Sequence, residues 1–208
     1  MIPKVMFRYS KVYDAVFQTL SSDKFKDVND KIFDAREKFA KKKIQILKKW
    51  WANKEKNVLN KISKITNVKW EQKEIKIYLL PDAYRLFWLG GFSEPLTVFL
   101  RYKKKNGEEK EKSLMLIKNT IIHELVHQNL SPKKGYTSYV NSLKKKYKCN
   151  RICAAHIVVH AIISKIYSKE ELKFELERKI RNKSYKKAWE IVRKYGEDKI
   201  IKDFLKIH

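Results

Sequence analysis

The chain has 208 residues, 43% of them hydrophobic and 12% aromatic, which excludes a disordered protein and suits one domain with a core or a domain plus a helical extension. Its 49 Lys and Arg residues against 23 Asp and Glu give a formal net charge of +26. No apolar run approaches the roughly 18 residues that a membrane helix needs, so we expect no membrane association.

The start of the chain and the cysteines indicate a cytoplasmic protein. Residues 1–10 contain no apolar stretch followed by small residues, so we expect no signal peptide. The two cysteines, Cys149 and Cys153, provide no disulfide framework. A chain of this kind fits a reducing compartment.

The positive charge has two interpretations. Lysine runs at 41–43, 103–105 and 144–146 are spread along the chain and would attract nucleic acid or another polyanion. A lysine-rich solvated surface gives the same composition. The chain has no zinc-finger spacing, no RNP-type aromatic pattern and no basic zipper. Nucleic acid is therefore kept as an alternative partner and is not the favoured one.

The first 70 residues are predicted to be helical. Residues 1–22 form a short amphipathic helix with Ser10 as its N-cap. Its apolar stripe is Val12, Val16, Phe17 and Leu20. From Asp23 or Asp27 to about Ile65, apolar residues recur at steps of three and four, which predicts one long helix or two helices broken around residues 41–43.

The apolar period changes to two at Glu74, which predicts strands at 74–80, 96–102 and 113–117. The dipeptide Asn106-Gly107 accepts the positive φ of a type I′ turn and would join the last two strands as a hairpin. We therefore expect a short, mostly antiparallel sheet of about three strands.

Two apolar helices are predicted after the sheet. Asn119 or Thr120 caps the first, which ends near Asn129. Asn150 caps the second, which runs to about residue 166 and is apolar nearly all round, so that it is expected to be buried.

Shorter helices complete the chain. One is expected at 138–147, between the two apolar helices. Ser168 and Ser184 are expected to open two charged helices, and Gly196 separates a last short one. Their apolar stripes indicate a helical extension that packs on the rest of the protein.

The first of the apolar helices contains His123-Glu124-Leu125-Val126-His127, which reads H-E-x-x-H. On a helix, His123 and His127 lie one turn apart on one face and can offer ring nitrogens to the same ion. Glu124 is turned from them by about 100°, so it can reach a water on the metal without being a ligand. This is the arrangement of a zinc-hydrolase helix, with two ligands and a general base.

A hydrolytic zinc ion needs three protein ligands and one open position. The chain has five histidines, and His156 and His160 lie four apart on the buried helix that follows the motif. Because they share a face, spacing leaves both open as the third ligand of one zinc ion; we favour His156, which lies nearer the start of its helix. The other would be an outer hydrogen-bond partner or a donor to the transition state.

The two cysteines and these two histidines superficially form a second zinc pattern. Cys149 and His160 are eleven residues apart, or about 16 Å along one helix. Ligands that lie roughly 2.0–2.3 Å from one ion cannot be so far apart. Cys149 and Cys153 are therefore expected to pack in the core.

The span from about Glu74 to Tyr167 resembles the minimal core of the zincin metallopeptidases, in particular the small minigluzincins. The resemblance implies that His123 and His127 are zinc ligands and that Glu124 is the general base, which assists attack of a zinc-bound water on a peptide bond. The chain departs from gluzincins because their third ligand is a Glu. A third histidine is similar to SprT-like proteases, but the Cys-rich zinc ribbon of that family is absent from this sequence.

The expected fold is therefore α+β. A small zincin-like core at 71–168, with a metal-binding helix and a second ligand helix, follows an N-terminal helical segment at 1–70 and precedes a C-terminal helical extension at 169–208.

By the same resemblance, the substrate is expected to be a protein or peptide bound in extended form along a strand edge, either 96–102 or 113–117. The candidate donors to the transition state are Tyr136, Tyr139 and the spare histidine of the pair, His160 if His156 is the ligand.

Overall fold

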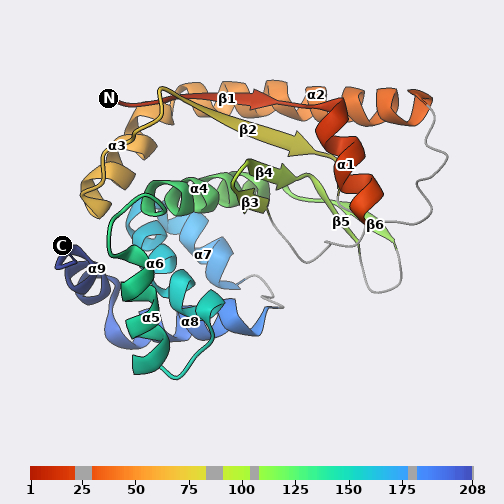
Figure 1. The fold of residues 1–208 in the computed structure, drawn as a ribbon. Helices are drawn as coiled ribbons and strands as arrows, with labels where there is room; N and C mark the ends of the chain where they lie inside the picture. Colours follow the sequence, from red (N-terminus) through yellow and green to blue (C-terminus); the bar gives the residue numbers. More distant parts are fainter. Residues whose placement is uncertain (22–29, 83–90, 104–107, 178–181, 208) are drawn as a thin grey trace. The chain divides into compact units, whose positions relative to one another are not determined.

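Figure 1 shows the computed structural model of the chain, which describes residues 1–21, 30–82, 91–103, 108–177 and 182–207. The chain folds into two compact units. The sheet unit consists of Pro3–Lys56 and Gln72–Glu124, and the helical unit consists of Met1–Ile2, Asn57–Glu71 and Leu125–His208. The division into 1–70, 71–168 and 169–208 stays a prediction.

The sheet unit contains a four-stranded sheet in the order β1-β2-β4-β3. The strands are β1 Lys4–Arg8, β2 Glu74–Leu80, β3 Gly91–Ser93 and β4 Leu96–Phe99. The β1–β2 and β2–β4 pairs are parallel, and only β3 runs antiparallel to its neighbour. The α+β class is confirmed, but the mostly antiparallel sheet of about three strands is wrong, because the sheet is mixed and mostly parallel.

β1 occupies part of the segment that was predicted to be helical. Val5 and Phe7 are buried and alternate with exposed or half-buried residues, which is the period of a strand. Its register pairs Lys4 with Glu74, seventy residues away. That long-range pairing stabilises a five-residue strand for which the local sequence gives little signal.

Helix α1, Lys11–Ser21, follows β1. The Ser10 hydroxyl accepts the Tyr13 N–H at 3.2 Å, so the predicted N-cap is confirmed. The predicted apolar stripe is wrong at Val12 and Val16, which are 76% and 46% exposed, whereas Phe17 packs against the buried pair Leu80 and Phe99. The side chain of Leu20 lies outside the described part of the structure.

Two helices follow, α2 Asp30–Ala52 and α3 Glu55–Thr66. The chain thus breaks at residues 53–54 and not at 41–43, and the openings at Asp23 or Asp27 lie outside the described residues. α2 lies along β1 and β2 (Figure 1), and its Trp51 ring meets the Phe7 ring edge-on at 6.3 Å.

A buried ionic cluster ties the sheet unit together. Arg36 of α2 donates to the Asp14 carboxylate at 2.8 Å and to the Asp82 carboxylate at 3.0 Å. Asp14 also accepts the Tyr9 hydroxyl at 2.9 Å, and Gln18 donates to the Asp82 carbonyl at 2.9 Å. One guanidinium thus faces two carboxylates, and hydrogen bonds from Tyr9 and Gln18 add to the two ion pairs.

After the β5–β6 hairpin, Arg101–Lys103 with Glu109–Glu111, the chain enters helix α4, Leu114–Leu130. The predicted strand at 113–117 is wrong. The Ser113 hydroxyl accepts the Leu116 N–H at 3.2 Å and so caps α4, which leaves Asn119 and Thr120 inside the helix and not at its start. The short apolar run at 114–117 is compatible with a strand or with a buried helix. It is helical because Ser113 caps the first turn.

The helical unit is built around α6, Arg151–Ile166, which packs against α5, α8 and α9. The other helices are α5 Tyr136–Lys146, α7 Lys169–Glu177, α8 Lys183–Tyr195 and α9 Glu197–Leu205. Among the described residues no single helix has the length and hydropathy to span a membrane, and α5 and α6 meet that criterion only as a pair bent by 108°.

The helix starts follow the expected chemistry at α6 and α7 but not at α8. The Asn150 side chain accepts the Cys153 N–H at 2.8 Å and caps α6 as predicted. Ser168 accepts the Glu171 N–H at 3.2 Å, while Glu171 accepts the Ser168 N–H at 2.8 Å, which forms a capping box. α8 is capped by Asn182 and not by the predicted Ser184.

Candidate metal centre

Helix α4 presents two histidines one turn apart. His123 is 8% exposed, and His127 follows it on the same face of the helix. The helix around them is buried at Ile121, Ile122, Leu125 and Val126. Two imidazoles are thus held along a rigid, buried helix, where ligands keep a fixed separation.

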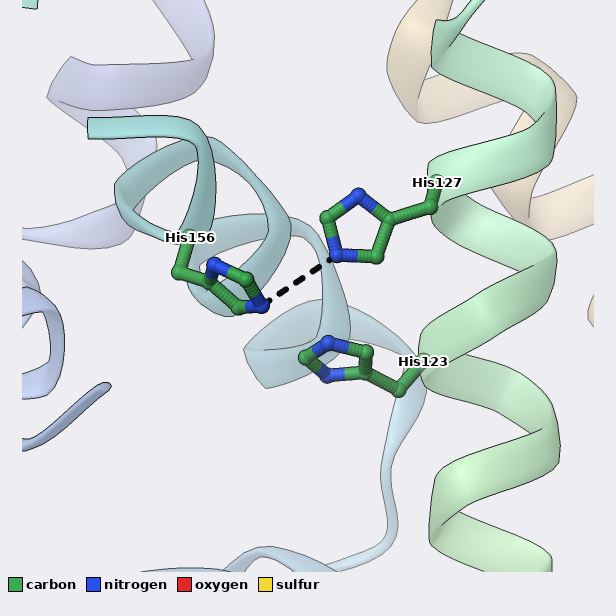
Figure 2. A group of neighbouring side chains, drawn as sticks. All are labelled: His123, His127 and His156. Atoms are coloured by element: carbon green, nitrogen blue, oxygen red, sulfur yellow. Dashed lines mark hydrogen bonds between the residues drawn. The ribbon is translucent and has the colours of Figure 1, made fainter. Parts of the chain in front are cut away.

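Helix α6 supplies the third histidine of the cluster. One ring nitrogen from each of His123, His127 and His156 lies within 4.8 Å of the others, and Figure 2 shows the three rings converging. His127 Nε2 and His156 Nε2 are 3.3 Å apart. A tetrahedral ion with metal–nitrogen bonds of about 2.0–2.1 Å separates its ligand nitrogens by about 3.3–3.4 Å. The three side chains could therefore hold one metal ion.

The hydrogen bond on the far side of the His156 ring fixes its tautomer. Its Nδ1 lies 2.7 Å from the Ile152 carbonyl oxygen. A carbonyl only accepts, so the proton is on Nδ1 and the lone pair is on Nε2, the atom that faces His127. Metal-binding histidines are commonly oriented by such a bond to a backbone carbonyl.

Burial keeps the rings in the form that binds metals. Burial, with a smaller contribution from the neighbouring His156, lowers the pKa of His127 to about 3. Burial also lowers the pKa of His156 to about 4, although the bond to the Ile152 carbonyl acts in the opposite direction. Both imidazoles are neutral at physiological pH, so no proton has to be removed before a metal binds.

Glu124 is buried beside the first ligand in sequence. Burial raises the pKa of its carboxyl to about 8, against an opposing effect of Lys112. Strand β3 runs close to it: a Cβ added to Gly91 would lie 3.4 Å from Glu124 Cγ and 2.3 Å from the Thr97 carbonyl oxygen. Only a glycine allows β3 to approach so closely. A carboxyl with a pKa near neutrality can both take and give a proton.

The structure brings His156 to the α4 pair, while His160 lies against another ring. The His160 imidazole stacks on the Trp189 indole with centroids 4.2 Å apart and planes at 15°. Within the described residues, the group able to share one metal consists of His123, His127 and His156.

Tyr136 and Tyr139 pack against Phe204 of α9, with ring centroids 6.3 Å and 5.9 Å away. The Tyr139 hydroxyl also donates to the Ile200 carbonyl at 3.4 Å. Burial is the main cause that raises the pKa of both phenols, so they stay protonated. Their role as transition-state donors, like that of His160, stays a prediction.

Comparisons of the chain with protein-family models, curated proteins and solved structures give no match. The zincin family therefore stays a prediction. The structure itself supports a buried three-histidine cluster that could hold one metal ion.

Sequence reasoning missed three residues around the cluster. Gly91 lies outside the predicted strands, although a glycine that begins a strand signals a close approach. Lys112 was given no role, and no pattern marks it. Tyr185 was treated as part of a helical extension, yet its ring lies 3.9 Å from that of His156.

Proposed function

We propose that the three-histidine cluster holds a zinc ion and that the protein is a zinc-dependent metallopeptidase. The observation that carries the proposal is the convergence of His123, His127 and His156, with two ring nitrogens at 3.3 Å, next to the buried Glu124. A zinc ion held there would supply Lewis acidity, which activates a water at neutral pH and polarises the peptide carbonyl.

Glu124 is the proposed general base. Its burial and its place beside the first ligand on α4 support proton uptake from the attacking water and delivery of that proton to the leaving amine. Because Glu124 is one residue from His123 on the same helix, its carboxyl faces away from the ligand direction and is available for this role.

The peptide is proposed to bind along β3. Of the two strand edges predicted for this purpose, β4 lies between β2 and β3, and 113–117 belongs to α4. β3 pairs with β4 alone among the described strands, and it passes Glu124 at Gly91. An extended peptide added to this edge would bring a backbone carbonyl near the proposed base.

Hydrolysis of an unfolded protein by the zinc-loaded full chain is the direct test. Glu124→Gln should lower the rate by roughly 100- to 10,000-fold while zinc remains bound. Glu177→Gln, at an exposed glutamate of α7, is the matched control and should keep full activity. A Glu124→Gln protein that hydrolyses as fast as the wild type would contradict the proposed mechanism.

The zinc site itself is tested by metal content. His123→Ala and His127→Ala should each abolish stoichiometric zinc binding, measured by elemental analysis after dialysis. Stoichiometric zinc in both variants would reject the site independently of any activity.

One observation favours the alternative of polyanion binding. A hollow of about 480 Å³ beside β1 and α2 is lined by four cations, Arg8, Lys41, Lys42 and Lys48. Lys41 forms an ion pair with Glu37 at 2.7 Å, so the hollow keeps a net positive charge. A nucleic-acid role predicts that Lys42→Glu with Lys48→Glu weakens binding of a DNA oligonucleotide and lowers its salt dependence. Negligible DNA affinity of the wild type at low salt would dismiss this role.

A further inference from the structure

Helix α8 carries two aromatic residues one turn apart that face two histidines one turn apart on α6. Tyr185 lies over His156, with ring centroids 3.9 Å apart and planes at 30°. Trp189 stacks on His160 at 4.2 Å and 15°. The two histidine rings are 5.6 Å apart, so the four rings form a continuous ladder within the helical unit.

The contact with Tyr185 completes the restraint on the His156 ring. The bond from Nδ1 to the Ile152 carbonyl fixes one edge of the imidazole, but it allows the ring to tilt about that bond. A phenol ring packed on the imidazole face opposes this tilt. Together the two contacts hold Nε2 toward His127, 3.3 Å away.

Trp189 holds the other histidine of the pair. His160 and Trp189 are 1% and 2% exposed, and their planes are nearly parallel. Tyr185 also reaches the His160 ring at 6.0 Å. Rotation of α6 that brought His160 toward the α4 histidines would break this stack and the contact on His156 at once.

Hydrogen bonds set which α8 residues face the histidines. The Asn150 side chain caps α6 and donates to the Ser184 hydroxyl at 2.8 Å. Asn182 accepts the Ser184 and Tyr185 N–H groups at 2.9 Å and 3.4 Å. Lys187 donates to the Lys148 carbonyl at 2.9 Å. The first turn of α8 is thus joined to the chain at the start of α6.

We propose that Tyr185 is a positioning residue for the metal ligand His156, and that α8 belongs to the metal centre although it supplies no ligand. The inference rests on the proposed metal site and adds to it the helix that orients the third ligand. It assigns the effect to the packing of the Tyr185 ring on the His156 imidazole.

The test compares zinc affinity of Tyr185→Leu, Tyr185→Phe and the control Tyr195→Leu in the full chain, by competition with a chromogenic chelator. Tyr195 is on the same helix, and its ring lies near Tyr147 at 5.2 Å, so the control makes the same chemical change away from the histidines. Loss of a residue that orients a ligand typically costs 10- to 100-fold in metal affinity. We expect such a loss for Tyr185→Leu and changes within about twofold for the other two variants.

Cobalt(II) substitution gives a readout that general destabilisation does not move. The visible absorption of the bound ion should shift in Tyr185→Leu and stay unchanged in Tyr185→Phe and Tyr195→Leu. Wild-type zinc affinity and an unchanged cobalt spectrum in Tyr185→Leu would overturn the inference. Equal losses in Tyr185→Leu and Tyr185→Phe would overturn it too, because the hydroxyl would then be responsible. If Tyr185→Leu does not fold, Tyr185→Met is measured in its place and judged by the same outcomes.

Failure of the proposed function gives a different result. If the wild type binds zinc but does not hydrolyse peptides, the affinity comparison still decides the role of Tyr185. If the wild type binds no zinc, the contact between Tyr185 and His156 is tested in the metal-free protein, by NMR of the imidazole nitrogens and ring protons of His156. Displaced His156 signals in Tyr185→Leu would support it, and unchanged signals would reject it.

Discussion

The molecule buries two polar clusters that differ in how their members satisfy one another. In the ionic cluster, Arg36 lies between Asp14 and Asp82, and opposite charges meet at 2.8 Å and 3.0 Å. In the histidine cluster, groups of one kind meet, and Nε2 of His127 faces Nε2 of His156 at 3.3 Å. The first cluster joins protein groups of opposite charge, whereas the second presents converging nitrogen ligands for which a cation is the natural complement.

A buried polar group that binds a ligand can be distinguished from one that only stabilises the fold. Burial alone does not distinguish the clusters, because Asp14 is fully buried and His156 is 6% exposed. What distinguishes them is the kind of group that meets: a cation lies between two anions in the first cluster, and ring nitrogens face one another in the second. Substitutions in the two clusters separate a cluster that only stabilises the protein from one that also binds a metal ion.

The largest effect on stability is expected for Arg36→Met. It leaves the buried carboxylates of Asp14 and Asp82 without their cation, which should lower the free energy of unfolding by about 3–5 kcal/mol. Urea unfolding should show the same loss with and without zinc. Lys41→Met on the same helix removes an exposed pair with Glu37 and should cost at most about 1 kcal/mol. If Arg36→Met also lowers the free energy of unfolding by at most about 1 kcal/mol, the ionic cluster is not required for stability.

Zinc should stabilise the wild type by about 2.7–4.1 kcal/mol when its free concentration is 100 to 1,000 times the dissociation constant. His160→Ala should gain the same increment from its own lower baseline, because the His160 ring stacks on Trp189. His156→Ala should gain none. Thermal or urea unfolding with zinc and after chelator treatment measures the three increments, and a zinc increment in His156→Ala would contradict the assignment of the third ligand.

A smaller effect is expected for Gly91→Ala. The added methyl group would meet the Thr97 carbonyl at 2.3 Å, so β3 must shift, at a cost of about 1–3 kcal/mol. The shift also disturbs the surroundings of Glu124, so hydrolysis should fall while zinc content is unchanged. Ser93→Ala on the same strand is the control. Full peptidase activity in Gly91→Ala would argue against β3 as the substrate edge.

The smallest effect is expected for Ser168→Ala, which removes one half of the capping box with Glu171. Loss of such a cap costs about 0.5–2 kcal/mol. It should change neither zinc affinity nor the response to Arg36→Met, because the cap belongs to neither cluster. Ser142→Ala, at an exposed hydroxyl of α5, is the matched control for the unfolding measurement.

The sequence predicts the helices well where capping residues and apolar periods agree, as at Asn150 and Ser168. The prediction fails where pairing with a distant strand, or a competing signal for the start of a helix, determines the local structure. β1 is a strand because Lys4–Arg8 pairs with residues seventy positions later. Residues 114–117 are helical because Ser113 caps them, although their apolar run also suits a strand.

The local sequence is also insufficient to predict the whole candidate site. The H-E-x-x-H spacing is enough to put His123 and His127 on one face of a helix. The choice between His156 and His160 depends on how α6 is rotated about its own axis, and no spacing within α6 contains that information. The α8 rings that contact both histidines come from residues about thirty positions further along the chain.

The facing pairs of α6 and α8 also predict how this protein can change during evolution. Asn150 with Ser184, His156 with Tyr185 and His160 with Trp189 each make a contact across the two helices. Substitutions at one member are therefore expected to be accompanied by substitutions at the other. A homologue that keeps the histidines of α4 but has lost both rings of α8 is expected to have abandoned the third ligand at the position of His156.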